Sequence, residues 1–146
     1  MEIARPKPIG HASVARQLRS ILFSEALVGA ALVRPKGYSR VVLSQFLGWA
    51  APFVAKRATE PLPPTILYIA VTTVDVRLFA KPLFADPFEI GRWKKSAYRA
   101  SLRESGLTLK LDLEVEGLGR VTVTSGRDAR AVLGLVVQGA SGPVMP

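Results

Sequence analysis

The stretch KSAYRASLRESGLTLKLDLEVE (Lys95–Glu116) carries the clearest fold signal in the sequence. On both sides of Ser105-Gly106, apolar residues alternate with polar ones, which is the period of a half-buried β-strand. Two such segments joined by two residues, the second of them glycine, predict a β-hairpin. A hairpin of this kind belongs in an antiparallel sheet, so the stretch predicts a β-rich C-terminal half.

The predicted turn at Ser105-Gly106 also fixes a register, in which the numbers of paired residues sum to 211. In that register apolar residues face one another on one side of the hairpin, and opposite charges face one another on the other side. The apolar pairs are Leu102 with Leu109, Ala100 with Leu111 and Tyr98 with Leu113, and the charged pairs are Arg99 with Asp112 and Lys95 with Glu116. Because a slip of one residue would destroy both matches, we expect this register.

Similar patterns extend the sheet on both sides of the hairpin. The further predicted strands are Ile66–Thr72, Asp75–Ala80, Phe88–Trp93 and Arg120–Thr124. Thr73-Val74 forms the bend between the first two, and Gly117-Leu-Gly119 makes the turn before the last. In that last strand we expect Val121 and Val123 to point inward.

A helix is predicted to follow the last strand. Ser125 is a suitable N-cap, and Asp128 is an acidic residue in the first turn, where it complements the helix dipole. The apolar stripe of this helix consists of Ala129, Val132, Leu133 and Val136. Glycines and prolines end it, so residues 138–146 are expected to be a loose tail.

The N-terminal part has a different pattern from the β-rich C-terminal half. Residues 1–11 hold two prolines and a glycine and predict a flexible, extended arm. Ser13 could cap a helix that runs to about Glu25, with Val14, Leu18, Ile21 and Leu22 at helical spacing. Residues 26–33 fit either a continuation of that helix or a buried strand, and their valines favour the strand.

Val41–Ala55 is an apolar stretch of fifteen residues, shorter than the ~20 that cross a membrane comfortably. It predicts a buried helix. The alternative is a helix lying among lipid headgroups, with Phe46, Trp49 and Phe53 as anchors and with Arg40, Lys56 and Arg57 at its ends. The proline-rich segment 60–64 then separates a helical part (12–60) from a β-rich part (65–137) of one domain.

Several strands followed by one amphipathic helix is the element order of pleckstrin-homology-like (PH-like) domains, and residues 66–137 resemble bacterial members of that family. The resemblance is carried by the hairpin Val71–Phe79, the segment Glu89–Lys94, the leucine-rich strand Leu107–Leu113 and the closing helix Ser125–Val137. It implies an α+β fold, an antiparallel sheet forming a partly open barrel capped by the C-terminal helix, with N-terminal helices.

In this alignment Ala26–Arg34 would be the first strand and Gly37–Arg57 an inserted helix. The insertion replaces the short loop in which lipid-binding members carry a Lys/Arg pair. No residue here inherits that role, so the resemblance implies a binding or assembly scaffold only.

The chain has no cysteine, which excludes disulfides and thiol chemistry and agrees with a cytoplasmic protein. Its net charge of +9 attracts polyanions such as nucleic acid, anionic lipid or acidic protein, or simply keeps the protein soluble. The only histidine, His11, falls in the predicted arm, and Asp112, Glu114 and Glu116 fit a solvated strand face better than a calcium site. We therefore expect no catalytic residue, metal or cofactor.

The run Arg92–Arg103 holds five basic residues and no acidic one. Arg92, Trp93, Lys94 and Arg103 are its candidates for contact with a polyanion, because cations beside an aromatic ring can bind phosphates and stack on a base. The leading hypothesis is a PH-like protein-interaction or self-assembly module, whose partner is another protein or a second copy of the chain in a homo-oligomer. The alternatives are a peripheral protein at the inner face of the membrane, using residues 41–55, and nucleic-acid binding through residues 92–103.

Overall fold

The computed structural model describes residues 9–19, 21–22, 27–35, 66–81, 86–117 and 119–144. The strands are β1 (Ile9–Gly10), β2 (Leu27–Pro35), β3 (Ile66–Thr72), β4 (Asp75–Lys81), β5 (Phe88–Lys94), β6 (Arg99–Ser105), β7 (Thr108–Val115) and β8 (Gly119–Gly126). The helices are α1 (Ala12–Arg19), a 3-10 turn η2 (Arg127–Ala129) and α4 (Arg130–Gly139). The predicted helix 41–55 lies outside the described residues, as do the candidates Arg40, Phe46, Trp49, Phe53, Lys56 and Arg57.

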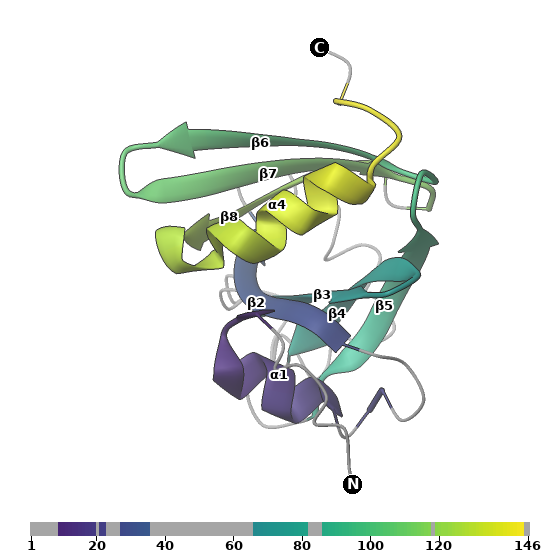
Figure 1. Cartoon of the computed structure of the whole chain (residues 1–146), viewed down its shortest axis with the longest axis vertical. Helices are drawn as coiled ribbons and strands as arrows, with labels where there is room; N and C mark the ends of the chain where they lie inside the picture. Colours follow the sequence, from purple (N-terminus) through teal and green to yellow (C-terminus); the bar gives the residue numbers. More distant parts are fainter. Residues whose placement is uncertain are drawn as a thin grey trace, which may run out of the picture.

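The strands lie in the order β5-β4-β3-β2-β8-β7-β6, all antiparallel, with β1 added parallel to β2. β2 is shared between two halves: Leu27–Val33 pairs with β3, and Arg34 and Pro35 pair with β8. We call β2–β5 the first sheet, and β6–β8 with the end of β2 the second sheet. α4 lies between the two, and α1 lies beyond the first sheet (Figure 1). The expected α+β class and antiparallel sheet with a closing C-terminal helix are confirmed, with one N-terminal helix described.

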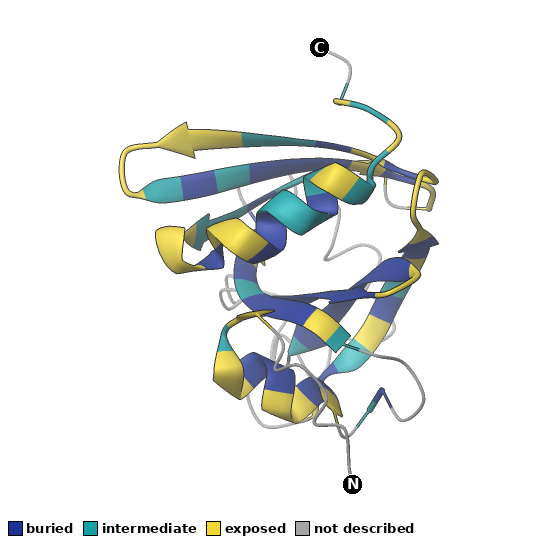
Figure 2. Cartoon of the chain, viewed as in Figure 1, coloured by how far each residue is buried: buried dark blue, intermediate teal, exposed yellow. Residues whose placement is uncertain are grey.

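The two central strands of the first sheet, β3 and β4, are buried on both faces. Leu67 and Ile69 of β3 point into the main core, which α4 also fills, whereas Tyr68 and Ala70 point to the other side and pack with α1. Most residues of β3 and β4 are therefore buried (Figure 2). This explains the nearly continuous apolar sequence of these strands. The predicted strands Ile66–Thr72 and Asp75–Ala80 are confirmed, and so is the interpretation of residues 27–33 as a strand.

The predicted hairpin exists, but its register was wrong. The turn residues are Gly106 and Leu107, so paired numbers sum to 213, with Ser105 opposite Thr108. Gly106 has φ +62°, a conformation that two-residue turns of type II′ require at their first position and that glycine adopts most easily. Placing glycine second, at Ser105-Gly106, would have forced a positive φ on Ser105.

The shift is two residues, so each side chain keeps its predicted face while its partner changes. Leu102 lies opposite Leu111, and Arg99 lies opposite Glu114 instead of Asp112. The predicted pairs of Lys95 with Glu116 and of Tyr98 with Leu113 are also wrong, because residues 95–98 form a turn before β6. The apolar alternation could not distinguish the two registers, since both bury the same residues.

The final helix begins later than predicted. β8 continues through Ser125, whose hydroxyl donates a hydrogen bond to Leu32 O at 2.8 Å, so Ser125 is not the N-cap. α4 follows the η2 turn with Ala129 as its N-cap, without a side-chain capping bond. The predicted apolar stripe is confirmed: Ala129, Val132, Leu133 and Val136 are all fully buried.

Both ends of the domain are tied to the sheet. α1 ends at Arg19 rather than near Glu25, and Val14 and Leu18 form its buried side as predicted. His11, expected in a flexible arm, donates its backbone N–H to Ala30 O at 2.9 Å. The expected loose tail is held as far as residue 144, since Ser141 N donates to Tyr98 O at 2.8 Å and Ala100 N to Gly142 O at 3.1 Å.

Candidate binding face on the second sheet

The predicted polyanion contacts do not form one surface. Trp93 is 9% exposed and belongs to the main core, and its Nε1 donates a hydrogen bond to Glu116 O at 3.0 Å. It cannot serve as a stacking platform for a base. Arg92 and Lys94 lie on β5 in the first sheet, whereas Arg103 lies on β6 in the second.

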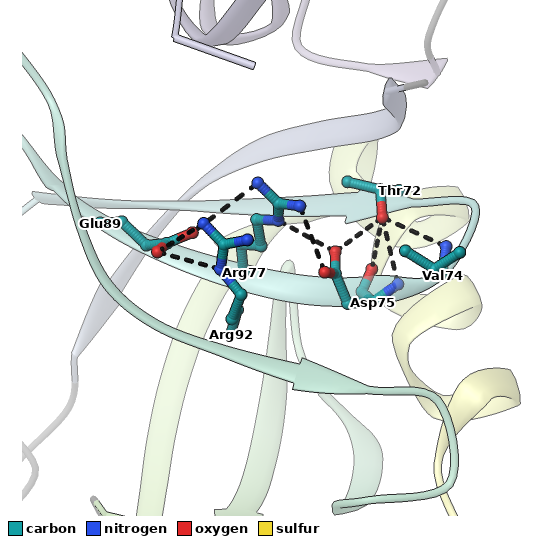
Figure 3. A network of polar contacts seen from close by, with 6 residues as sticks. All are labelled: Thr72, Val74, Asp75, Arg77, Glu89 and Arg92. Atoms are coloured by element: carbon teal, nitrogen blue, oxygen red, sulfur yellow. Dashed lines mark hydrogen bonds and ion pairs between the residues drawn. The ribbon is translucent and has the colours of Figure 1, made fainter. Parts of the chain in front are cut away.

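Arg92 belongs to a polar network on β3, β4 and β5 (Figure 3). Arg77 donates from Nε to Asp75 Oδ1 at 3.0 Å and from Nη2 to Asp75 Oδ2 at 3.2 Å. Thr72 donates its hydroxyl to Asp75 Oδ1 at 2.6 Å. Glu89 links the network to Arg92, with Oε1 3.8 Å from Arg77 Nη1 and Oε2 accepting from Arg92 Nε and Nη2 at 3.1 and 3.0 Å.

The inner part of this network is enclosed by the protein. Asp75 and Arg77 are 5% and 4% exposed, and together they form a two-bond fork between a guanidinium and a carboxylate. Burial by itself would raise the pKa of Asp75. Hydrogen bonds from Arg77 and Thr72, with the charges of Arg77 and Arg92, outweigh it and hold that pKa below the ordinary 3.8. These groups neutralise one another, so we assign the network to stability.

The outer face of the second sheet is a different surface. Directly paired residues in an antiparallel sheet share a face. The register places thirteen residues on the outer face, of which twelve are polar and one is a glycine. They are Arg99, Ser101, Arg103 and Ser105 of β6, Thr108, Lys110, Asp112 and Glu114 of β7, Arg120, Thr122, Thr124 and Gly126 of β8, and Arg34 of β2. We call these residues the basic face.

The residues that alternate with these along the strands point to the opposite face and fill the core. Leu109, Leu111, Val121 and Val123 are fully buried. α4 lies on that inner side, between the two sheets (Figure 1). In the described part of the chain, no helix lies over the basic face.

Cations outnumber carboxylates on the basic face. In one row Arg103, Lys110 and Thr124 lie side by side, with Arg34 next to Thr124, so one row carries three cations across four strands. In another row Arg99, Glu114 and Arg120 are neighbours.

The central carboxylate of the face is already engaged. Arg103 Nη2 lies 2.9 Å from Asp112 Oδ2, and the Thr122 hydroxyl donates to Asp112 Oδ1 at 2.6 Å. The sequence run 92–103 thus contributes Arg99 and Arg103 to the face. Sequence reasoning missed Arg34, Lys110 and Arg120, which come from other segments.

A small depression of about 270 Å³ adjoins this face where β2 separates from β8, and His11, Arg34, Thr108, Thr124 and Ser125 are among its lining residues. The imidazole of His11 is engaged at both nitrogens. Leu32 N donates to Nδ1 at 2.9 Å, and Asp128 Oδ2 lies 2.8 Å from Nε2 without the alignment of a hydrogen bond. The ring therefore fastens β1 to the start of η2 and is not placed to activate the Ser125 hydroxyl.

A second, open depression of about 470 Å³ lies beside the 95–98 turn and is lined by Tyr98, Arg99, Glu114 and Ser141 among others. Burial raises the pKa of Tyr98 to about 12. Its hydroxyl donates to Val136 O at 2.6 Å, so Tyr98 links the last turn of α4 to the turn before β6. Neither depression brings together groups suited to acid–base or nucleophilic chemistry.

The described residues contain no helix long and apolar enough to cross a membrane, and no group of three or more histidine, aspartate or glutamate side chains placed to hold a metal ion. Comparison of the chain with protein-family models, with curated proteins and with solved structures gives no match in any of the three.

Proposed function

We propose that the chain is a PH-like, non-catalytic module for protein interaction or self-assembly. The observation that carries the proposal is the shared strand β2, through which one antiparallel sheet wraps around the main core and is closed by α4. A partly open barrel capped by a C-terminal helix is what the resemblance to PH-like domains implies. A cytoplasmic location is part of the same proposal.

The polar groups inside the described residues favour a binding role over a catalytic one. Asp75 and Arg77 satisfy each other, and both nitrogens of His11 are in contact with other groups. A catalytic acid, base or nucleophile needs a group that faces an open pocket and remains available to a substrate. Binding through a surface makes no such demand.

The outer edge of β6 supports an interaction between chains. The tail pairs with this edge at Tyr98 and Ala100, whose peptide groups point away from β7. Peptide groups alternate along a strand, so those of Leu102 and Glu104 point to the same side, and no backbone group among the described residues bonds to them there. An edge with open N–H and C=O groups can pair with a strand of another chain.

The test removes one edge donor and uses a second variant to control for the loss of the Glu104 side chain, which forms an ion pair with Arg130 of α4. Glu104→Pro abolishes the outward N–H, and edge strands tolerate proline, whereas Glu104→Ala removes the same side chain and keeps the N–H. We expect sedimentation equilibrium at up to about 1 mM to give self-association of the wild-type and Glu104→Ala chains and a monomer for Glu104→Pro. A wild-type chain that stays monomeric, and captures no partner that Glu104→Pro loses, would contradict the proposal.

Peripheral membrane association is a second candidate, carried by the apolar sequence 41–55 and its basic flanks. It predicts that the protein floats with anionic vesicles at low salt and that Trp49→Ser with Phe53→Ser abolishes flotation. No flotation of the wild-type chain would remove it.

A further inference from the structure

The basic face has a composition that restricts its partner. Its five cations (Arg34, Arg99, Arg103, Lys110 and Arg120) outnumber its two carboxylates, Asp112 and Glu114, by three. Five of its other residues are serines or threonines, and the last is Gly126. The face therefore offers cations and hydroxyl donors and carries no apolar or aromatic side chain.

These properties separate the classes of anionic partner. Stable protein interfaces are anchored by buried aromatic or aliphatic side chains, which the face lacks. Proteins that lie on a membrane insert apolar side chains among the headgroups, and the face has none. Contacts to nucleic-acid phosphates, in contrast, come from arginine, lysine, serine and threonine, which are the residues present here.

We infer that the basic face of the second sheet binds double-stranded nucleic acid through its phosphate backbone. Binding of single strands relies on aromatic side chains that stack on the bases, and none points outward here. This surface is separate from the β6 edge, so the inference goes beyond the proposed interaction module and does not depend on it.

The size of the face fits a duplex. Adjacent strands lie about 4.8 Å apart, so Arg103 and Arg34, three strands apart, are separated by roughly 14 Å. Arg99 and Arg103 lie four residues apart on β6, or roughly 13 Å. A surface of these dimensions reaches phosphates on both strands, since the grooves between them are about 6 and 12 Å wide. No base contact is implied, so we expect little dependence on sequence.

The experiment measures binding of the full chain to a labelled duplex DNA of about 20 base pairs by fluorescence anisotropy at several salt concentrations, with duplex RNA of the same sequence as a second probe. Three to five neutralised phosphates predict a fall in affinity of about 40- to 500-fold between about 50 and 200 mM salt. Both duplexes should bind, because the shared chemistry is the phosphodiester backbone.

A matched pair of variants locates the site. Arg34→Gln, Arg99→Gln and Lys110→Gln remove three charges from the basic face, whereas Arg16→Gln, Arg19→Gln and Lys94→Gln remove three exposed charges elsewhere. We expect the first set to lower affinity at least about tenfold and to reduce the salt slope by about three, and the second set to change affinity by less than about threefold.

Thermal unfolding checks that both triple variants fold. If the triple variant of the basic face does not fold, the single variants Arg34→Gln and Lys110→Gln are measured in its place. Each single change should reduce the salt slope by about one. Equal losses from the two triple sets would show that net charge alone is responsible and would overturn the inference. No duplex binding at low salt, or competition by polyglutamate or anionic vesicles as effective as that by unlabelled duplex, would overturn it as well.

Discussion

The two sheets of this molecule differ in where their charged residues lie. In the first sheet, β3 and β4 are buried between the main core on one side and α1 on the other, and they enclose Asp75 and Arg77. The second sheet buries its apolar residues on one face, and its cations lie on the other. The Arg103 side chain, for example, is 59% exposed although it is paired with the buried Asp112.

This difference indicates which charged residues stabilise the fold and which can bind a partner. A charge enclosed by packing must be compensated inside the protein, so it is committed to the fold. A charge on an open sheet face is solvated and contributes little to stability, so it is available to a partner. Replacing charges in the two sheets should therefore give opposite patterns of stability and binding.

The largest expected effect is on the network of the first sheet. Asp75→Ala leaves the buried guanidinium of Arg77 without its main partner and should lower the free energy of unfolding by about 3–5 kcal/mol. Urea denaturation measures the loss. Asp112→Ala is the matching change in the second sheet and should cost only about 1–2 kcal/mol, because Arg103 can turn to solvent. Equal losses at the two positions would contradict the comparison.

Removing the packing of α1 on the first sheet should have the next effect. Leu18 is fully buried in the cluster that α1 forms with Tyr68 and Phe79. Leu18→Ala should therefore destabilise the protein by about 2–4 kcal/mol. Arg16→Ala, on the exposed side of the same helix, should stay within about 0.5 kcal/mol. A small loss at Leu18 would mean that α1 does not cover this sheet in solution.

The depressed pKa of Asp75 predicts a pH dependence confined to acid. Because the folded-state pKa lies below 3.8, the carboxylate stabilises the fold fully above the unfolded-state pKa of about 3.9, and this contribution is lost as the pH falls through the folded-state pKa. The difference in unfolding free energy between the wild-type chain and Asp75→Asn should be constant from neutral pH to about pH 5 and shrink below pH 4. A constant difference down to pH 2 would show that the carboxylate charge contributes nothing.

Tyr98 gives the smallest expected change, in the second sheet. Tyr98→Phe removes the hydrogen bond to Val136 O and should cost about 1 kcal/mol at neutral pH. The folded-state pKa of about 12 lies above the unfolded value of about 10, so the neutral tyrosine is favoured in the fold, and stability falls as the pH rises above 10. Absorbance titration of the folded protein should lose a step near pH 12 in the variant. A step near pH 10 for this residue would contradict its burial.

Much of the fold could be predicted from period-two alternation, because each strand buries one defined face. The bounds of Ile66–Thr72 and the strand character of residues 27–33 are confirmed. Alternation shows only which face of a strand a residue lies on, however, so it could not distinguish two registers that differ by two residues. The position of Gly106 in the turn distinguishes them. Ser125 was misread as a cap because its hydroxyl instead bonds Leu32 O, which is distant in sequence.

The candidate site was less predictable. A run of basic residues in sequence alternates between two faces of a strand and can continue from one sheet into another, as Arg92–Arg103 does. Trp93, which looked like a stacking group, is a core residue. The basic face gathers Arg34, Lys110 and Arg120 from three segments, and only their pairing across strands places them on one side.

The central claim is that the outer face of the second sheet, and not the first sheet, binds an external partner. An NMR titration of the labelled full chain with the duplex DNA tests it most directly, because each backbone amide reports separately. We predict that shift changes will be concentrated in Arg99–Arg103, Lys110–Glu114 and Arg120–Thr124, and that amides of β3, β4 and α1 will stay unchanged. Shift changes centred on the first sheet, or none at a saturating concentration of duplex, would contradict it.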